Sequence, residues 1–230
     1  MESIDKLPGT FDRRIGESKA VVPTAVIKRL PRYHRCLTDL IREGKMRISS
    51  KELSEIMEVT ASQIRQDLNC FGGFGQQGYG YNVKYLHAKI SELLGATDGY
   101  RAVIVGAGNL GSALAATHMF ERRGVRRLAL FDVNEAIIGS EICGLPVYHI
   151  DSLEEYVREN SVDIGVLTVP KEAAIDVTDA MIRGGVRGIW NFANMELKVS
   201  DPGVIVENVH MGDSLMTLCY AIKNQMTKED

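Results

Sequence analysis

Residues 101–111 decide the fold, and they read Arg-Ala-Val-Ile-Val-Gly-Ala-Gly-Asn-Leu-Gly. An apolar run typical of a buried strand leads directly into the pattern GxGxxG, and residues 112–123 continue with the apolar face of a helix. Gly106 permits a tight turn, Gly108 lets the backbone approach a pyrophosphate, and Gly111 allows close packing of helix on strand. This order of strand, glycine turn and helix predicts a dinucleotide-binding unit whose helix N-terminus faces phosphate groups.

An acidic residue follows the next predicted strand. Asp132 directly follows residues 127–131 and lies about 20 residues beyond the glycine pattern. At this position an acid can hydrogen-bond ribose hydroxyls and repel a 2′-phosphate. This position favours NAD(H) over NADP(H). The arginines at 122, 123, 126 and 127 suggest a 2′-phosphate site instead, but their places at a helix end and before a strand favour a solvated surface. A structural glycine turn in an empty domain remains the alternative.

Strands alternate with helices from Tyr100 to the end of the chain, which predicts an α/β fold with a doubly wound parallel sheet. The predicted strands are residues 101–105, 127–131, 163–169, 187–192 and 204–209, and the predicted helices are 109–123, 151–159, 171–184 and about 213–225. Thr168, Val169 and Pro170 close a strand at the carboxyl edge, where ligands bind in such folds. The predicted NADH and NAD+ contacts are Gly106, Ala107, Gly108, Asn109, Leu110, Gly111, Asp132, Val133, Thr168, Val169 and Pro170.

The N-terminal part shows helical periodicity from Pro23 to Gly44, with Pro31 as a possible kink. Ser49 to Glu52 and Thr60 to Gln63 both fit the capping box, which predicts two short helices at about 50–57 and 60–68. Residues 71–81 alternate glycine with aromatic residues and glutamine, as in a tight hairpin. This order predicts a winged helix-turn-helix, followed by a helix at about 83–94 and a linker at 95–99.

The second helix of a helix-turn-helix enters the major groove with its first turn. Ser62, Gln63, Arg65 and Gln66 are therefore the candidate base readers, since Gln pairs with adenine and Arg with guanine. Arg29, Ser49 and Ser50 are candidate phosphate contacts. Residues 1–84 carry a net charge of +4 and the remainder −7, which suits a nucleic-acid module joined to a second domain. A purely structural three-helix module is the alternative.

Catalytic chemistry has little support in the sequence. His118, His149 and His210 are isolated, and no set of residues suggests a proton donor at a hydride site, so no catalytic residue is predicted. The alternative is a small NAD-dependent oxidoreductase. Four widely separated cysteines predict reduced, mostly buried thiols and no metal site. The sequence has no apolar run of about 20 residues and no apolar N-terminal signal core, which predicts a cytoplasmic protein without membrane contact.

Ordered motifs over most of the chain resemble a known family, the bacterial redox-sensing transcriptional repressor Rex. The motifs are Pro23-Thr-Ala-Val-Ile-Lys-Arg-Leu-Pro31, Ile48-Ser-Ser-Lys-Glu-Leu53, Val59-Thr-Ala-Ser-Gln-Ile-Arg-Gln-Asp-Leu68, Phe71-Gly-Gly-Phe-Gly75, Gly78-Tyr-Gly-Tyr81, Val105-Gly-Ala-Gly-Asn-Leu-Gly-Ser-Ala-Leu114, Leu167-Thr-Val-Pro170 and Val206-Glu-Asn-Val209. The resemblance implies a homodimer that binds palindromic operator DNA when NADH is scarce and releases it when NADH rises.

The domain organisation expected from motifs and resemblance has four parts. Residues 1–20 form a flexible tail, 21–84 a winged-helix DNA-binding domain, 85–212 a Rossmann NAD(H)-binding domain, and 213–230 a C-terminal helix and tail. The resemblance implies that this last helix is swapped onto the partner subunit.

Several positions bear on how the switch of that family would operate. Arg35 takes the place of an arginine that pairs with an aspartate after the Glu-Asn-Val motif, but His210 replaces that aspartate. Thr117 stands where a tyrosine is typical, and Gln66 where a lysine is common. Asp213 is a candidate substitute partner for Arg35. Alternatively, His210 predicts pH-sensitive or weak switching.

Overall fold

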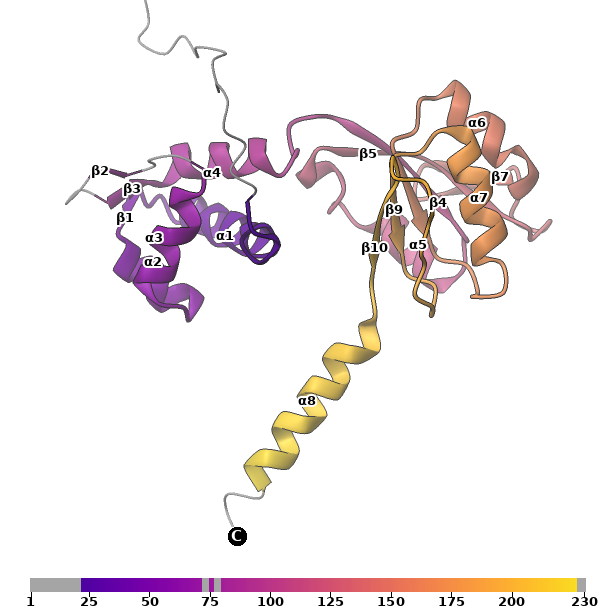
Figure 1. Ribbon diagram of the computed structural model, residues 1–230. Helices are drawn as coiled ribbons and strands as arrows, with labels where there is room; N and C mark the ends of the chain where they lie inside the picture. Colours follow the sequence, from indigo (N-terminus) through magenta and orange to yellow (C-terminus); the bar gives the residue numbers. More distant parts are fainter. Residues whose placement is uncertain (1–21, 72–74, 77–79, 227–230) are drawn as a thin grey trace, which may run out of the picture. The chain divides into compact units, whose positions relative to one another are not determined.

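A computed structural model describes residues 22–71, 75–76 and 80–226 of the chain. The internal contacts divide the chain between Leu94 and Gly95 into two compact units, each with its own core (Figure 1). The expected boundary after residue 84 lies too early, because the helix that follows packs against the first helix of the N-terminal unit.

The N-terminal unit is a helical domain with a small antiparallel sheet. Its elements are α1 (Thr24–Arg42), β1 (Arg47–Ile48), α2 (Ser50–Met57), α3 (Ala61–Asn69), β2 (Gly75–Gln76), β3 (Gly80–Asn82) and α4 (Val83–Leu93), with sheet order β1-β3-β2. Helix α1 continues through Pro31. Residues 72–74 and 77–79 of the predicted hairpin lie outside the described residues, and β2 and β3 pair on either side of the second gap.

The C-terminal unit is built on a seven-stranded sheet with the order β10-β9-β8-β4-β5-β7-β6. Its elements are β4 (Tyr100–Val105), α5 (Asn109–Ala116), β5 (Val125–Asp132), β6 (Glu141–Ile142), β7 (Leu145–His149), α6 (Leu153–Glu159), β8 (Ile164–Leu167), α7 (Ala174–Gly184), β9 (Gly188–Asn191), β10 (Ile205–Asn208) and α8 (Met211–Met226). All neighbouring strands in this sheet pair in parallel, except that β6 pairs with β7 in the antiparallel direction. The sequence did not predict either of these two strands.

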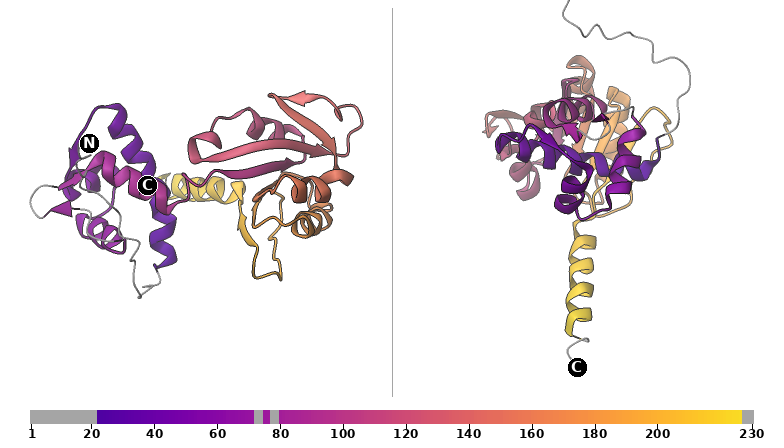
Figure 2. Two further views of the ribbon diagram at one scale, coloured as in Figure 1. Left: turned by 90° about the horizontal axis from the view of Figure 1, so that it is seen from above. Right: turned by 90° about the vertical axis from the view of Figure 1, so that its left-hand side faces the viewer.

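Both faces of β4 are buried. Val103 and Val105 pack in the cluster formed with α6 and α7, while Ile104 lies in the cluster on the opposite face with Ala115 of α5. Figures 1 and 2 show α6 and α7 side by side along the sheet. This burial explains why residues 101–105 are almost continuously apolar.

Helix α5 ends at Ala116, seven residues before the predicted end at 123, and Glu121–Arg123 forms a separate 3₁₀ turn. The reason is tertiary packing, since Phe120 is buried with its ring edge-on to Trp190. Arg127 donates to the carbonyl of Ala115 and lies 2.7 Å from a carboxylate oxygen of Glu121. Arg127 is therefore part of the packed helix end, with 10% of its side chain exposed, and its placement on a solvated surface was wrong.

The cysteine prediction also needs correction. Cys36 is half-buried, whereas Cys70, Cys143 and Cys219 are exposed. Among the described residues, no helix is long and apolar enough to span a bilayer. Within the same ranges, no group of three or more His, Cys, Asp or Glu side chains is placed to hold a metal ion.

Candidate functional site

The glycine turn forms between β4 and α5, as the sequence predicted. Gly106 has a φ of +99°, and a Cβ atom there would lie 2.7 Å from the carbonyl oxygen of Thr168. A Cβ atom on Gly111 would overlap the carbonyl oxygen of Gly106. Gly108 is different, since it is exposed and a Cβ atom would meet nothing within 4 Å. Two glycines therefore serve packing, and the third leaves open space at the helix N-terminus.

Asp132 holds this turn in shape. Its Oδ2 accepts a hydrogen bond from the Ala107 N–H at 2.6 Å, and its Oδ1 accepts from the N–H groups of Val133 and Asn134 at 2.8 and 2.9 Å. Since each carboxylate oxygen accepts about two hydrogen bonds, Oδ2 keeps capacity for one more donor. The side chain is half-buried and can receive a ribose hydroxyl without losing its contacts to the turn.

Thr168 joins the end of β8 to the same turn. Its hydroxyl is directed at the carbonyl oxygens of Val105, at 2.9 Å, and Gly106, at 2.8 Å. Strand β4 lies between β5 and β8. The chain runs from β4 to β5 on one side and later returns to β8 on the other side, so the turn after β4 lies at the topological switch point of the sheet. Val169 is half-buried, and Pro170 and Val133 are exposed beside the turn. The structure thus places all the predicted nucleotide contacts around one sheet edge.

The N-terminus of α5 suits an anion. Its N-cap residue is Gly108, so no side chain accepts from the first N–H groups of the helix. Asn109 is exposed and Leu110 half-buried at this end. Free N–H groups and the helix dipole together attract phosphate oxygens. A dinucleotide pyrophosphate therefore fits this turn, and the nicotinamide ring of the bound nucleotide would be either reduced or oxidised.

In the N-terminal unit, α3 presents most of its predicted base readers. Ser62, Arg65 and Gln66 are exposed and Gln63 is half-buried. Arg65 donates to the hydroxyl of Ser50 at 3.2 Å, so α2 and α3 approach each other at this end. Ser49 completes the predicted capping box with Glu52, and the Lys45 ammonium together with the Ser49 N–H lowers the pKa of Glu52 to about 2.

Arg29 is paired with an acid of its own unit. Its guanidinium donates twice to Asp67, with Nε to Oδ2 and Nη2 to Oδ1 both at 2.7 Å. The Tyr33 hydroxyl donates to Oδ2 at 2.9 Å. Asp67 lies in α3 and is fully buried, whereas Arg29 and Tyr33 lie in α1. Arg29 therefore fixes α3 on α1, a structural role that the sequence did not predict, and its phosphate contact stays a prediction.

Gln63 supplies the fourth hydrogen bond to Asp67. Thr60 caps α3 by accepting from the Gln63 N–H at 3.1 Å, but the Gln63 side chain does not reach back to Thr60. Its Nε2 donates instead to Asp67 Oδ1 at 2.8 Å. The second capping box is thus only half formed, because the Gln63 amide is turned toward Asp67, one helical turn further along α3, and not back toward the Thr60 N–H.

The four switch candidates lie in both units. Arg35 is exposed on α1, and Thr117 is half-buried after α5, where its hydroxyl donates to the carbonyl of Leu114. In the C-terminal unit, His210 Nε2 lies 3.0 Å from Glu196 Oε2, and Asp213 is exposed in the first turn of α8. Glu196 is a partner for His210 that the sequence reading did not consider.

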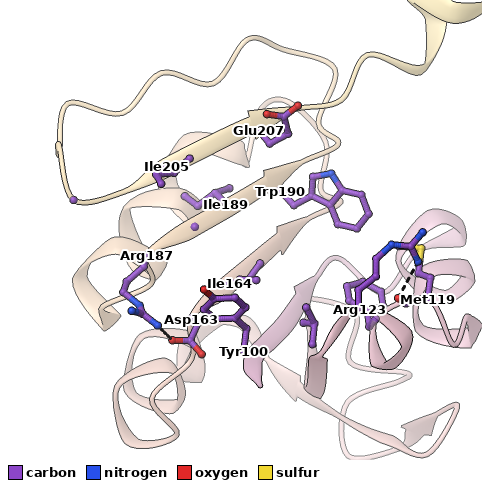
Figure 3. A pocket seen from close by; sticks show the side chains of 14 residues that line it. Tyr100, Met119, Arg123, Asp163, Ile164, Arg187, Ile189, Trp190, Ile205 and Glu207 are labelled. Carbon is purple, nitrogen blue, oxygen red and sulfur yellow. Dashed lines mark hydrogen bonds and ion pairs between the residues drawn. The ribbon is translucent and has the colours of Figure 1, made fainter. Parts of the chain in front are cut away.

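A cavity of about 850 Å³ lies over β4, β8, β9 and β10 (Figure 3). Its floor is apolar, with Ile164, Ile189, Ile205 and Trp190, and the ion pair of Arg187 with Asp163 lies at one end. Trp190 lies in this cavity with its ring against Phe120 and Phe192.

The two units match different family models. Residues 21–69 match the model described as "Putative DNA-binding protein N-terminus", and residues 97–195 match "CoA binding domain". A redox-sensing transcriptional repressor Rex of Clostridium tetani is 52% identical over 91% of this chain and 99% of its own length. The Rex of Clostridioides difficile is 52% identical over 88% of this chain and 96% of its own.

Solved structures give the same result. The crystal structure of RSP in complex with β-NAD+ and operator DNA has a TM-score of 0.84 and 47% identity, covering 92% of this chain and 97% of RSP. RSP in complex with β-NADH has a TM-score of 0.83 and 44% identity, covering 92% and 98%.

A helical DNA-binding unit joined to a Rossmann-like dinucleotide unit defines a ligand-responsive transcription regulator. The relatives and the order of motifs make the assignment specific. The chain belongs to the Rex family of redox-sensing transcriptional repressors.

Proposed function

We propose that this chain is an NAD(H)-responsive repressor that binds palindromic operator DNA through α3 and is released by NADH. The observation that carries the proposal is the nucleotide turn, in which Gly108 leaves open space before an uncapped helix N-terminus and Asp132 keeps one acceptor position. The relatives that cover nearly the whole chain are repressors, not enzymes, which supports a role without catalysis.

The residues act on the nucleotide by binding and orientation. The first N–H groups of α5 receive the pyrophosphate, and the free position on Asp132 Oδ2 receives an adenosine ribose hydroxyl. Val133, Val169 and Pro170 flank the turn. If NADH favours a dimer whose recognition helices no longer match the operator half-sites, DNA weakens NADH binding by the same factor by which NADH weakens DNA binding.

The repressor acts as a homodimer in this proposal, with α8 swapped onto the partner. All of residues 211–225 are exposed, including Met211, Leu215, Met216, Leu218 and Tyr220. Apolar surface of this extent calls for a cover, and the apolar cavity over β8 to β10 provides a second uncovered surface of the same unit. We place the protein in the cytoplasm, where the bacterial operator DNA and NADH pool are found.

A repressor with altered switching is the second candidate. The contact between His210 and Glu196 favours it, because Glu196 competes with Arg35 for the His210 side chain. Such a protein binds the operator but responds to NADH weakly or only in a narrow pH range.

Fluorescence anisotropy of a labelled palindromic Rex operator at fixed salt tests both candidates. We expect NADH to release the DNA at concentrations at which NAD+ has little effect. The Asp132→Ala variant loses a charged acceptor, so we expect NADH release to need about tenfold more nucleotide or greater. DNA binding that neither nucleotide changes would refute redox sensing. Release by NADH only above or below a threshold pH would favour the second candidate.

A further inference from the structure

Gln63 differs from the other predicted base readers of α3, because it is the one among them whose side chain is hydrogen-bonded to Asp67. The other donors to Asp67 come from α1. Its Nε2 donates to Asp67 Oδ1, and within the described chain its Oε1 receives no hydrogen bond. An ionised carboxylate accepts hydrogen bonds but donates none. The nitrogen of the Gln63 amide must therefore face Asp67, and the oxygen must face the other way.

Asp67 stays ionised, which keeps the Gln63 amide in this one orientation. Burial by itself would raise the pKa of the Asp67 carboxyl, but the donors from Arg29, Gln63 and Tyr33 outweigh it and lower that pKa. Burial and the bond to Asp67 also raise the pKa of Tyr33, so its hydroxyl stays a donor. Two hydrogen bonds from Arg29 and one from Tyr33 fix the carboxylate itself. The amide thus rests on a rigid acceptor.

We propose that Asp67 is a positioning residue that presents the Gln63 amide in the one orientation that reads adenine in the operator. This inference rests on the proposed binding of α3 in the major groove. Nε2 carries two hydrogens, and one remains for DNA beside Oε1. That pair matches adenine, whose N6 amino group donates to Oε1 and whose N7 accepts from Nε2.

The fixed orientation also excludes the other purine. Guanine presents two acceptors, O6 and N7, in the major groove. An amide that rotates freely can turn its N–H groups toward both, whereas the held amide places Oε1 against O6. The discrimination against guanine therefore depends on Asp67, although Asp67 is buried and does not reach the DNA.

The first experiment uses the wild-type chain. A duplex that it binds is selected from a random pool, and each half-site adenine is then replaced by guanine, 7-deazaadenine or purine. At one position we expect guanine to weaken binding about tenfold or more, and loss of either N7 or the N6 amino group to weaken it about fivefold. Gln63→Ala should remove these differences. If no position depends on both atoms, the inference is wrong; if the wild type selects no duplex at all, the proposed function fails first.

The second experiment tests the role of Asp67. Asp67→Asn keeps the shape but lets the Gln63 amide face either way, and we expect the adenine-to-guanine preference to fall severalfold toward that of Gln63→Ala. Adding Asp67→Asn to Gln63→Ala should change the preference no further. Tyr33→Phe is the matched control, because it removes one donor from the same carboxylate and leaves the Gln63 contact in place.

The inference is overturned if a folded Asp67→Asn protein keeps the full preference, or if Tyr33→Phe loses as much of it. Thermal melting of the N-terminal unit verifies folding in each variant. Should Asp67→Asn fail to fold, the base replacements on the wild-type chain decide the question by themselves.

Discussion

Two aspartates show how differently the two units use a carboxylate. Asp67 in α3 is fully buried and receives four hydrogen bonds, all from side chains, three of them from α1. Asp132 at the end of β5 receives three, all from backbone N–H groups, and keeps one position free. The first carboxylate locks helices together, and the second shapes a turn that stays open to a ligand. The degree of internal satisfaction thus separates a structural acid from a binding acid.

Removal of the Arg29 guanidinium should break the first of these arrangements most severely. In Arg29→Ala, Asp67 stays buried without its cation, a loss that costs ~3–5 kcal/mol for a buried pair. Because 30% of the Arg29 side chain is exposed, we expect the lower value, about 3 kcal/mol, in the unfolding free energy of the N-terminal unit. Urea denaturation followed by circular dichroism measures it.

The chain provides an internal control for this measurement. Trp190 is its one tryptophan and lies in the C-terminal unit, so its fluorescence reports that unit and should keep its midpoint. Arg35→Ala removes an exposed arginine from the same helix and should cost less than about 0.5 kcal/mol. Equal losses of unfolding free energy in Arg29→Ala and Arg35→Ala would show that the ion pair of Arg29 with Asp67 does not stabilise the unit.

Substitutions at two glycines test the nucleotide turn that Asp132 holds. Gly111→Ala drives a Cβ atom into the Gly106 carbonyl and should cost about 1–3 kcal/mol in the C-terminal unit, with loss of NADH binding. Gly108→Ala meets nothing in the protein, so we expect an unchanged fluorescence midpoint but weaker NADH binding, because the Cβ atom fills the approach to the pyrophosphate. Trp190 fluorescence and NADH titration separate the effects. A stable Gly111→Ala protein that binds NADH normally would contradict this account.

The smallest effect concerns the packing of α1 on α4. His34 and His87 lie with ring centroids 4.4 Å apart, and burial lowers the pKa of His87. A lowered folded-state pKa means that the unfolded chain binds more protons, so stability is complete above the unfolded value of 6.5 and falls as pH decreases below it.

We therefore expect the melting temperature of the N-terminal unit to drop between about pH 7 and pH 5. His34 and His87 are the only histidines of that unit, so His87→Gln should reduce the dependence. A flat profile for the wild type would show that neither ring titrates differently on folding.

Sequence reasoning succeeded where the determinants are local. The spacing of Gly106 and Gly111, the hydrogen bonds of Asp132 to the two residues after it and the capping box at Ser49 each fix structure within a few residues, and the structure confirms them. It failed where residues far apart in the chain meet. No spacing relates Arg29 to Asp67, and the early end of α5 depends on contact between Phe120 and Trp190. Gln63 is a different case, because its side chain turns forward to Asp67 in the same helix and not back to the cap at Thr60.

The exposure of α8 has a thermodynamic consequence for any assembly in which it takes part. A lone helix of 16 residues is only marginally stable in water, and the described side chains of α8 are all exposed. If α8 docks on a partner, the free energy of docking must offset the entropy cost of ordering residues 211–226 as a helix. Association then becomes a coupled folding reaction, visible as a gain of ellipticity on concentration and as a large negative heat-capacity change.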